Sequence, residues 1–427
     1  MSSAQTPFQV ILAFISNAFG DSWVSTMKLP LKMLRSSRLP QGARWHAVRS
    51  SWRRQLPLLA KLVVVFSVVG YFFWNVTAIA SLVQSAGPAL RSEGPRAVAE
   101  GLRNAFTDIL AVRDSEEAWW LRPETYRKES GCDFSAAVAL FKPEELELNC
   151  ANMDQLETGE YIGKGFWREV YKAKWNGRDV AVKRVKEDHL SRPDIIPRHV
   201  EECASIFSIR NEPNIVGLVG WCKTTVVVDY IPHQLDTLLF ESEEPVSVHR
   251  ALKLARDAAR GVAQLHRAPG GPFVHADLQA RQFLIDTNGT LQLNDFNRIK
   301  YTGPRLVKGV PTDEKCTFET SVAKGKWRSP EEYRHLHLDE KLDIYSLSLV
   351  MWALRAREKP FRALEREEVY EKVPAGLRPA LEAMSDYPQQ MQDLVIRGWD
   401  TDPKKRPTAA EMADEIDRIL KNYESTR

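Results

Sequence analysis

The chain has 427 residues, of which 44% are hydrophobic and 27% are charged. This composition is ordinary for a globular protein and excludes wholesale disorder, and the length suits one large domain with a membrane or targeting region. The formal net charge of +3 is too small to indicate a nucleic-acid partner.

The N-terminal tail, residues 1–57, is basic: eight lysines and arginines lie between Lys28 and Arg54. It is followed by a run of 22 uncharged residues, Leu62–Val83. That length crosses a hydrocarbon core about 30 Å thick. A buried core helix is the alternative, but an uncharged run this long is more typical of a membrane span. We therefore expect a single transmembrane helix within residues 58–83.

The charge around this predicted span indicates its orientation. Eight basic residues precede the span, whereas the twenty residues after it contain only three, Arg91, Arg96 and Arg103. The positive-inside rule therefore places the N-terminus in the cytosol. Everything after residue 83 would then be lumenal or extracellular, as in a type II single-pass membrane protein. The alternative is that the basic, serine-rich start is an organelle transit peptide.

Residues 84–154 are predicted to form a stem. Cys132 and Cys150 flank its end and could bridge in an oxidising compartment. Cys203 and Cys222 stand in apolar surroundings, which favours buried free thiols. The five cysteines include no CxxC pair, which argues against a structural zinc site.

A domain predicted at residues 155–427 carries glycine, lysine and aspartate motifs in a fixed order. GKGFWREVYKAKW places Gly163 and Gly165 between strand-like runs, and VAVKRV follows with Lys183. FVHADLQARQFLID then contains Asp277, and LNDFNR contains Asp295 eighteen residues later. Glycines let a backbone approach phosphates closely, and lysine and aspartate suit phosphate and magnesium.

These motifs resemble those of the eukaryotic protein-kinase family, as a divergent member with HAD and DFN sequences. The resemblance implies an α+β, bilobal fold with a small antiparallel β N-lobe carrying one helix and a larger helical C-lobe. It also implies ATP with Mg²⁺, or Mn²⁺, as cofactors.

The resemblance assigns roles residue by residue. Asp277 would accept the proton of the substrate hydroxyl, Lys183 would hold the α- and β-phosphates, and Asp295 would bind magnesium. Lys183 should pair with a glutamate of the following helix, either Glu201 or, preferably, Glu202. The remaining ATP-binding and metal residues implied are Gly163, Gly165, Val170, Ala181, the gatekeeper Val228, Asp229, Ile231 and Gln282.

Structural motifs of the same family follow. Ser329-Pro330-Glu331 resembles its APE motif, Asp343 would bond back to the catalytic loop, and Arg406 would be the buried partner of Glu331. These residues indicate the fold and carry no information on activity.

Several positions depart from the family pattern. Arg168 replaces the third glycine, where it could narrow the pocket or touch phosphate. Ala276 replaces the arginine that pairs with a phosphorylated activation loop, which indicates activity not switched in that way. Gln282 replaces a magnesium-binding asparagine and weakens that site. Asn297 replaces the glycine of the metal-binding triplet, and Gln279 replaces a lysine.

The sequence therefore predicts a membrane-anchored protein kinase that acts on a protein hydroxyl and uses no nucleic acid. The alternative is a pseudokinase that binds nucleotide or scaffolds without transfer; a small-molecule kinase is disfavoured by the long activation segment. Asn288-Gly289-Thr290 is a glycosylation sequon on a predicted turn, which offers a test of topology.

Overall fold

The computed structural model describes residues 119–157, 159–190, 192, 194–308, 310–320 and 324–426. The predicted basic tail, the transmembrane helix at 58–83 and the first part of the predicted stem lie outside these residues. Within the described part of the chain, no helix is both long and apolar enough to span a bilayer.

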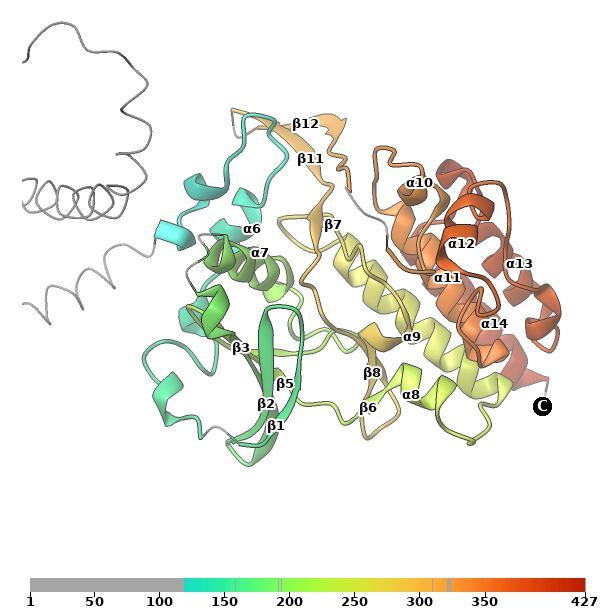
Figure 1. Ribbon diagram of the computed structural model, residues 1–427, viewed down its shortest axis with the longest axis horizontal. Helices are drawn as coiled ribbons and strands as arrows, with labels where there is room; N and C mark the ends of the chain where they lie inside the picture. The colour runs from blue at the N-terminus through green and yellow to red at the C-terminus, as the bar shows by residue number, and fades with distance from the viewer. Residues whose placement is uncertain are drawn as a thin grey trace, which may run out of the picture. The chain divides into compact units, whose positions relative to one another are not determined.

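The N-lobe is built on an antiparallel five-stranded sheet with the order β1-β2-β3-β5-β4 (Figure 1). The turn between β2 and β3 uses Asn176 and Gly177, both at positive φ, which is typical of a tight hairpin. Val180 and Val182 of β3 face one apolar cluster on the same side of the sheet. The strands are β1 (Tyr161–Lys164), β2 (Arg168–Trp175), β3 (Arg178–Val185), β4 (Leu218–Cys222) and β5 (Thr225–Asp229).

One long helix, α7 (Ile195–Phe207), packs with this sheet and buries Val200, Cys203, Ile206 and Phe207. A short 3-10 turn, η6 (Glu187–His189), precedes it. The predicted small β lobe with one helix is thus confirmed for the core of the N-lobe.

The C-lobe is mainly helical. Helices α9 and α11 lie at its centre (Figure 1). Most residues of α9 are buried, and α11 is almost wholly buried. Ser247 caps α9 by accepting a hydrogen bond from the backbone N–H of Arg250, and a capping box of Thr408 and Glu411 begins the last helix. The helices are α8 (Leu235–Phe240), α9 (Val248–His266), α10 (Pro330–Tyr333), α11 (Lys341–Ala356), α12 (Arg366–Lys372), α13 (Gln389–Gly398) and α14 (Ala409–Ser425), with 3-10 turns η7 (Ala280–Gln282), η8 (Leu381–Met384) and η9 (Pro403–Lys405).

Short strands of the C-lobe carry the loops at the junction with the N-lobe. A three-stranded sheet has the order β6-β8-β9, and two further pairs join β7 to β10 and β11 to β12. The strands are β6 (His233–Gln234), β7 (Phe273–Val274), β8 (Phe283–Ile285), β9 (Leu291–Leu293), β10 (Lys300–Tyr301), β11 (Pro304–Val307) and β12 (Val310–Lys315).

Residues 119–154, expected to belong to a stem, instead pack against both lobes. Phe134 stacks on Phe273 of the C-lobe with ring centroids 5.6 Å apart. Phe141 makes edge contacts with Phe207 of α7 and Trp221 of β4. These residues therefore form part of the folded body, and we call them the N-terminal extension. It contains η2 (Trp119–Leu121), η3 (Pro123–Tyr126), α6 (Ser135–Leu140) and η4 (Pro143–Glu145), and η5 (Met153–Gln155) lies across its end.

The end of the extension adds a segment beside β4. The backbone N–H of Leu148 donates to the carbonyl of Val219 at 3.1 Å, and the N–H of Trp221 donates to the carbonyl of Leu148 at 3.0 Å. Gly220 permits this approach, since a Cβ there would lie 2.4 Å from the Cβ of Leu148.

Two disulfides fix the extension to the two lobes. Cys132 is bonded to Cys316, 184 residues away, and Cys150 to Cys222, 72 residues away. The predicted bridge between Cys132 and Cys150 is therefore not formed. The prediction of a free thiol at Cys222 was wrong, because the extension brings Cys150 to β4, whereas Cys203 is free and buried as predicted.

Candidate active site

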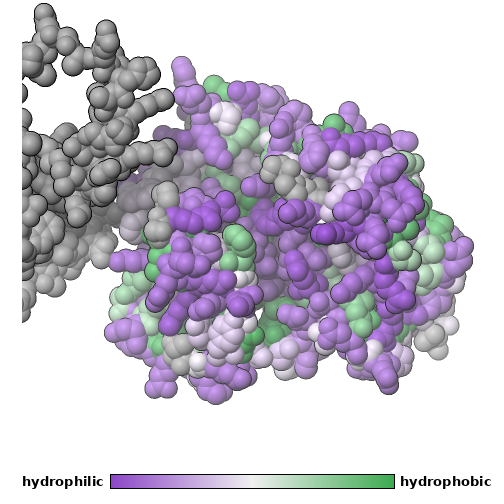
Figure 2. All heavy atoms as spheres, in the orientation of Figure 1, coloured by the Kyte–Doolittle hydropathy of each residue, from purple (hydrophilic) through white to green (hydrophobic). Residues whose placement is uncertain are grey.

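An open cleft of about 1460 Å³ lies between strands β1–β3 and the loops of the C-lobe. Figure 2 shows that hydrophilic residues gather in the hollow at the middle of this face. The structure brings to its walls all the predicted site residues except Glu202: Gly163, Gly165, Val170, Ala181, Lys183, Val228, Asp229, Ile231, Asp277, Gln282 and Asp295.

The catalytic loop, which carries His275 to Asp277, is held by Asp343 of α11. Its carboxylate accepts hydrogen bonds from the backbone N–H groups of His275 at 2.7 Å and Ala276 at 3.0 Å, and contacts His266 Nε2 at 2.9 Å. Ala276 has a φ of 58°, a strained conformation for a residue with a Cβ. The predicted bond from Asp343 back to the catalytic loop is confirmed, and it fixes the backbone on which Asp277 stands.

Asp277 is buried and surrounded by donors. Gln282 Nε2 donates to its Oδ2 at 3.0 Å, and Gln279 Nε2 donates to its Oδ1 at 3.3 Å. Arg328 also donates to Oδ1 through Nη2. No sequence motif indicated Arg328, although its position directly before Ser329-Pro330-Glu331 places it at the end of the activation segment.

Asp295 follows Asn294 on the neighbouring loop of the C-lobe and adopts a left-handed backbone, with a φ of 63°. Asn297 donates from Nδ2 to Asp295 Oδ1 at 2.7 Å, so the residue that replaces the family's glycine orients the aspartate. Lys183 Nζ donates to Asn294 Oδ1 at 3.2 Å. The carbonyl of Asn294 lies 2.9 Å from His275 Nε2, which connects this loop to the catalytic loop.

Glu202 does not form the expected ion pair with Lys183. It is buried in α7, and both of its carboxylate oxygens accept hydrogen bonds from the guanidinium of Arg168. Burial raises the pKa of Glu202, but the charge and hydrogen bonds of Arg168, with a contribution from Lys183, lower it overall. Arg168 is 5% exposed, and its charge is directed at Glu202.

Of the two candidate glutamates, Glu202 is the one whose side chain is near Lys183. Glu202 interacts electrostatically with Arg168 and Lys183, whereas Glu201 interacts with Lys128, Lys300 and Arg198. The pair is lost because a guanidinium at the third glycine position reaches the carboxylate in a bidentate manner, which a lysine ammonium cannot match.

Two residues that the sequence analysis missed enclose Arg168. The carbon of its guanidinium lies 4.1 Å from the ring centroid of Trp167, a cation–π contact, and His199 Nδ1 lies 3.3 Å from its Nη2. Burial, with the charges of Arg168 and Lys183, lowers the pKa of His199 well below its usual value. His199 is therefore neutral at pH 7.

The predicted pair of Glu331 and Arg406 is confirmed. Arg406 donates from Nη1 to Oε1 at 2.6 Å and from Nη2 to Oε2 at 2.8 Å. Since both groups are buried, loss of one partner would leave an uncompensated charge and cost roughly 3–5 kcal/mol. This pair ties the end of the activation segment to the body of the C-lobe.

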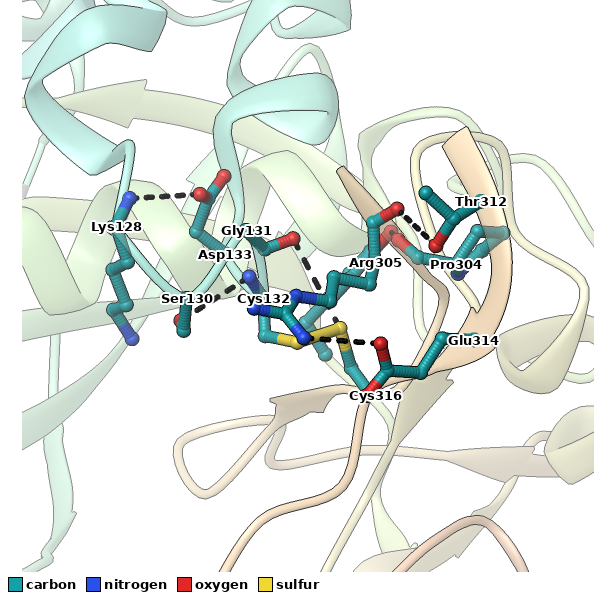
Figure 3. The surroundings of a disulfide bond; sticks show 11 residues. Lys128, Ser130, Gly131, Cys132, Asp133, Pro304, Arg305, Thr312, Glu314 and Cys316 are labelled. Atoms are coloured by element: carbon teal, nitrogen blue, oxygen red, sulfur yellow. Dashed lines mark hydrogen bonds and ion pairs between the residues drawn. A yellow bond between two sulfur atoms is a disulfide. The ribbon is translucent and has the colours of Figure 1, made fainter. Parts of the chain in front are cut away.

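The activation segment contains a hairpin, β11–β12, which is fixed to the N-terminal extension (Figure 3). The disulfide of Cys132 and Cys316 crosses between them, and the N–H of Leu306 donates to the carbonyl of Gly131 at 2.8 Å. Gly131 has a φ of 70°, and a Cβ there would lie 2.0 Å from the carbonyl oxygen of Leu306. The hairpin is therefore held by a covalent tether, in a chain that has Ala276 where the family pattern has an arginine.

Comparison with known proteins identifies the family to which this chain belongs. Residues 156–416, more than half of the chain, match the family model described as protein tyrosine and serine/threonine kinase. The chain belongs to this protein-kinase family.

Curated relatives agree with this assignment. The chain is 29% identical over 281 residues to serine/threonine-protein kinase 12 of Arabidopsis thaliana, covering 65% of this chain and 58% of the relative. It is 28% identical over 284 residues to integrin-linked protein kinase 1 of the same plant, covering 65% and 58%. It is 26% identical over 299 residues to human mitogen-activated protein kinase kinase kinase 7, covering 68% and 46%. The chain thus spans about half the length of these relatives.

Proposed function

We propose that this chain is a membrane-anchored protein kinase of divergent HAD/DFN type, which transfers the γ-phosphoryl group of ATP to a serine, threonine or tyrosine hydroxyl of a protein. The observation that carries the proposal is that Lys183, Asp277 and Asp295 line one open cleft. Asp277 and Asp295 stand on loops held by hydrogen bonds to Asp343 and Asn297.

The residues present fit ATP with magnesium. Among the described residues, Asn297 is the hydrogen-bond partner of Asp295 Oδ1, which leaves Oδ2 for a metal ion. Gln282 directs Nε2 to Asp277 and keeps its amide oxygen as a second ligand. The bound metal would neutralise phosphate charge.

Each of the three residues has a role in the transfer. Lys183 would hold the α- and β-phosphates from β3, and Asp277 would orient the acceptor hydroxyl and accept its proton. Apolar Val170, Ala181 and Val228 would enclose the base. A tethered activation segment and the Ser329-Pro330-Glu331 motif favour a peptide acceptor over a small molecule.

A pseudokinase is the second candidate, and one observation favours it. Glu202 is held by Arg168, whereas active kinases of this fold require the lysine–glutamate pair to be in place. The test is to incubate the full-length protein with ATP and Mg²⁺ or Mn²⁺, and to measure autophosphorylation beside thermal stabilisation. Transfer supports the kinase; stabilisation by nucleotide without transfer at any metal concentration supports the pseudokinase.

The proposed compartment is the lumen of the secretory pathway or the cell exterior, reached through a type II span within residues 58–83. Two disulfides support it, because cytosolic thiols are kept reduced. Import into an organelle is the alternative.

A further inference from the structure

Three arginines converge on the carboxylate of Asp277. Arg328 donates to Oδ1, Arg298 Nη1 lies 3.5 Å from Oδ1, and Arg281 Nη2 lies 3.7 Å from Oδ2. They come from three separate segments: the end of the activation segment, the residue after Asn297, and η7 of the catalytic loop. The fold therefore concentrates positive charge at the point which an acceptor hydroxyl must approach.

Arg328 is a structural member of this group. Its side chain is 5% exposed, and its nitrogens donate to the carbonyls of Lys324 at 3.2 Å and Ala276 at 2.8 Å. With its bond to Asp277, each guanidinium nitrogen has a partner. Arg328 therefore has little capacity left for a ligand.

Arg281 and Arg298 differ from it. Their side chains are 59% and 41% exposed, and both line the cleft. Among the described residues, each of the two side chains makes one polar contact, the long ion pair with Asp277. Asp277 already accepts hydrogen bonds from Gln279, Gln282 and Arg328, so the two exposed guanidiniums keep N–H donors that face the cleft.

The carboxyl that lies beside Arg328 carries only part of a negative charge at pH 7. Glu332 lies 3.7 Å from Arg328 and accepts bonds from the N–H and hydroxyl of Ser329. Burial raises the pKa of Glu332 to about 7 although Arg328 opposes the shift, so this carboxyl is partly neutral at pH 7. Three guanidinium groups thus share the carboxylate of Asp277.

We propose that Arg281 and Arg298 form an anion-binding subsite for the acceptor, so that the kinase selects hydroxyls flanked by a carboxylate or a phosphate on the protein chain. Guanidinium groups bind both anions in a bidentate manner. Arg281 and Arg298 each lie beside one carboxylate oxygen of Asp277, so a bound anion would lie close to the acceptor hydroxyl along the peptide. The acceptor is therefore an acidic segment or one already phosphorylated. This inference rests on the proposed function.

The test measures binding without requiring transfer. Fluorescent peptides with alanine at the acceptor position, flanked by glutamate, phosphoserine or glutamine, are titrated by anisotropy into the full-length protein with a non-hydrolysable ATP analogue and Mg²⁺. We expect the anionic peptides to bind at least about tenfold more tightly than the glutamine peptide, as charge-assisted hydrogen bonds imply. The glutamate and phosphoserine arms distinguish the two sources of the anion.

Variants assign the effect to the two arginines. Arg298→Gln and Arg281→Gln should each weaken binding of the anionic peptides about tenfold or more, and Arg298→Lys should retain most of it. Arg198→Gln is the matched control: Arg198 also lines the cleft, but it pairs with Asp194 at 3.0 Å.

Two results would overturn the subsite: equal binding of the three peptides, or loss of affinity for the ATP analogue alone in Arg298→Gln, which would assign the arginines to the nucleotide phosphates. Charge-selective binding in a protein that transfers nothing would contradict the kinase proposal and leave the subsite standing. Phosphate transfer without charge-selective binding would support the kinase proposal and contradict the subsite.

Discussion

Arg168 and Glu202 form a buried, bidentate ion pair that joins β2 of the nucleotide-binding hairpin to α7, with Nη1 and Oε1 3.0 Å apart. Their side chains are 7% and 5% exposed. The pair occupies the glutamate that the family commonly directs to the lysine of β3, and it leaves Lys183 bonded to Asn294.

This pair predicts strong coupling in a double-mutant cycle. Arg168→Met alone should lower the free energy of unfolding by roughly 3 kcal/mol or more, because it leaves the carboxylate of Glu202 buried without its main partner. Glu202→Met should have a similar cost, and the double variant should lose clearly less than the sum. Urea unfolding of the four proteins measures the coupling, and additive losses would contradict the pair.

The tether of the activation segment predicts a selective effect on proteolysis. Without the disulfide, in Cys132→Ser/Cys316→Ser, trypsin should cut faster at Lys308 and Lys315, which are exposed in the β11–β12 hairpin. Cys150→Ser/Cys222→Ser is the matched control, since it removes a disulfide that does not reach the hairpin. Each double variant should also lose about 2–5 kcal/mol of unfolding free energy, because it lacks one disulfide. Equal cleavage rates at the hairpin in both variants would show that the disulfide does not order it.

Glu332 predicts a pH dependence of stability. Its pKa is raised from 4.5 to about 7 by burial, against the opposing effect of Arg328. The folded state therefore holds a proton between pH 4.5 and 7 that the unfolded chain releases, so this group's contribution is fully present below pH 4.5 and lost as the pH rises through 7. The free energy of unfolding of the native protein and of Glu332→Gln is measured in urea at pH 5 and at pH 8. Between these two pH values the native protein should lose roughly 2–3 kcal/mol more stability than Glu332→Gln. Parallel pH profiles would contradict the shift.

The compartment predicts a glycan at Asn288. This residue is exposed in the turn between β8 and β9, with its backbone N–H bonded to Asp286. In a secreted or lumenal domain the protein expressed in eukaryotic cells should lose mass on treatment with an N-glycosidase, and Asn288→Gln should abolish that shift. Thr290→Ala is the control that keeps the asparagine and removes the sequon. Reduced cysteines at positions 132, 150, 222 and 316 in the purified protein would contradict the proposed compartment.

Local motifs predicted the fold and most of the candidate site. Glycine, lysine and aspartate motifs lie on strands and loops whose order the family fixes, and scaffold pairs such as Glu331–Arg406 follow from that order. The preference for Glu202 over Glu201 followed from helical periodicity.

Long-range competition accounts for what the sequence did not predict. Whether Glu202 meets Lys183 or Arg168 depends on where the guanidinium of Arg168 packs. That packing involves the adjacent Trp167 and also His199, which lies 31 residues further along the chain. The disulfide partners were missed because the extension was expected to be a separate stem, so that Cys132 and Cys316 had no reason to meet.

The central claim is that Asp277 accepts the proton of an acceptor hydroxyl in a working kinase. The direct measurement is transfer of labelled phosphate from ATP by the full-length protein and by Asp277→Asn, with nucleotide affinity measured for both. We expect transfer by the native protein, a loss of about 10²-fold or more in the variant, and similar affinity for ATP with magnesium in the two. Transfer that is unchanged in Asp277→Asn, or absent from the native protein while ATP still binds, would contradict it.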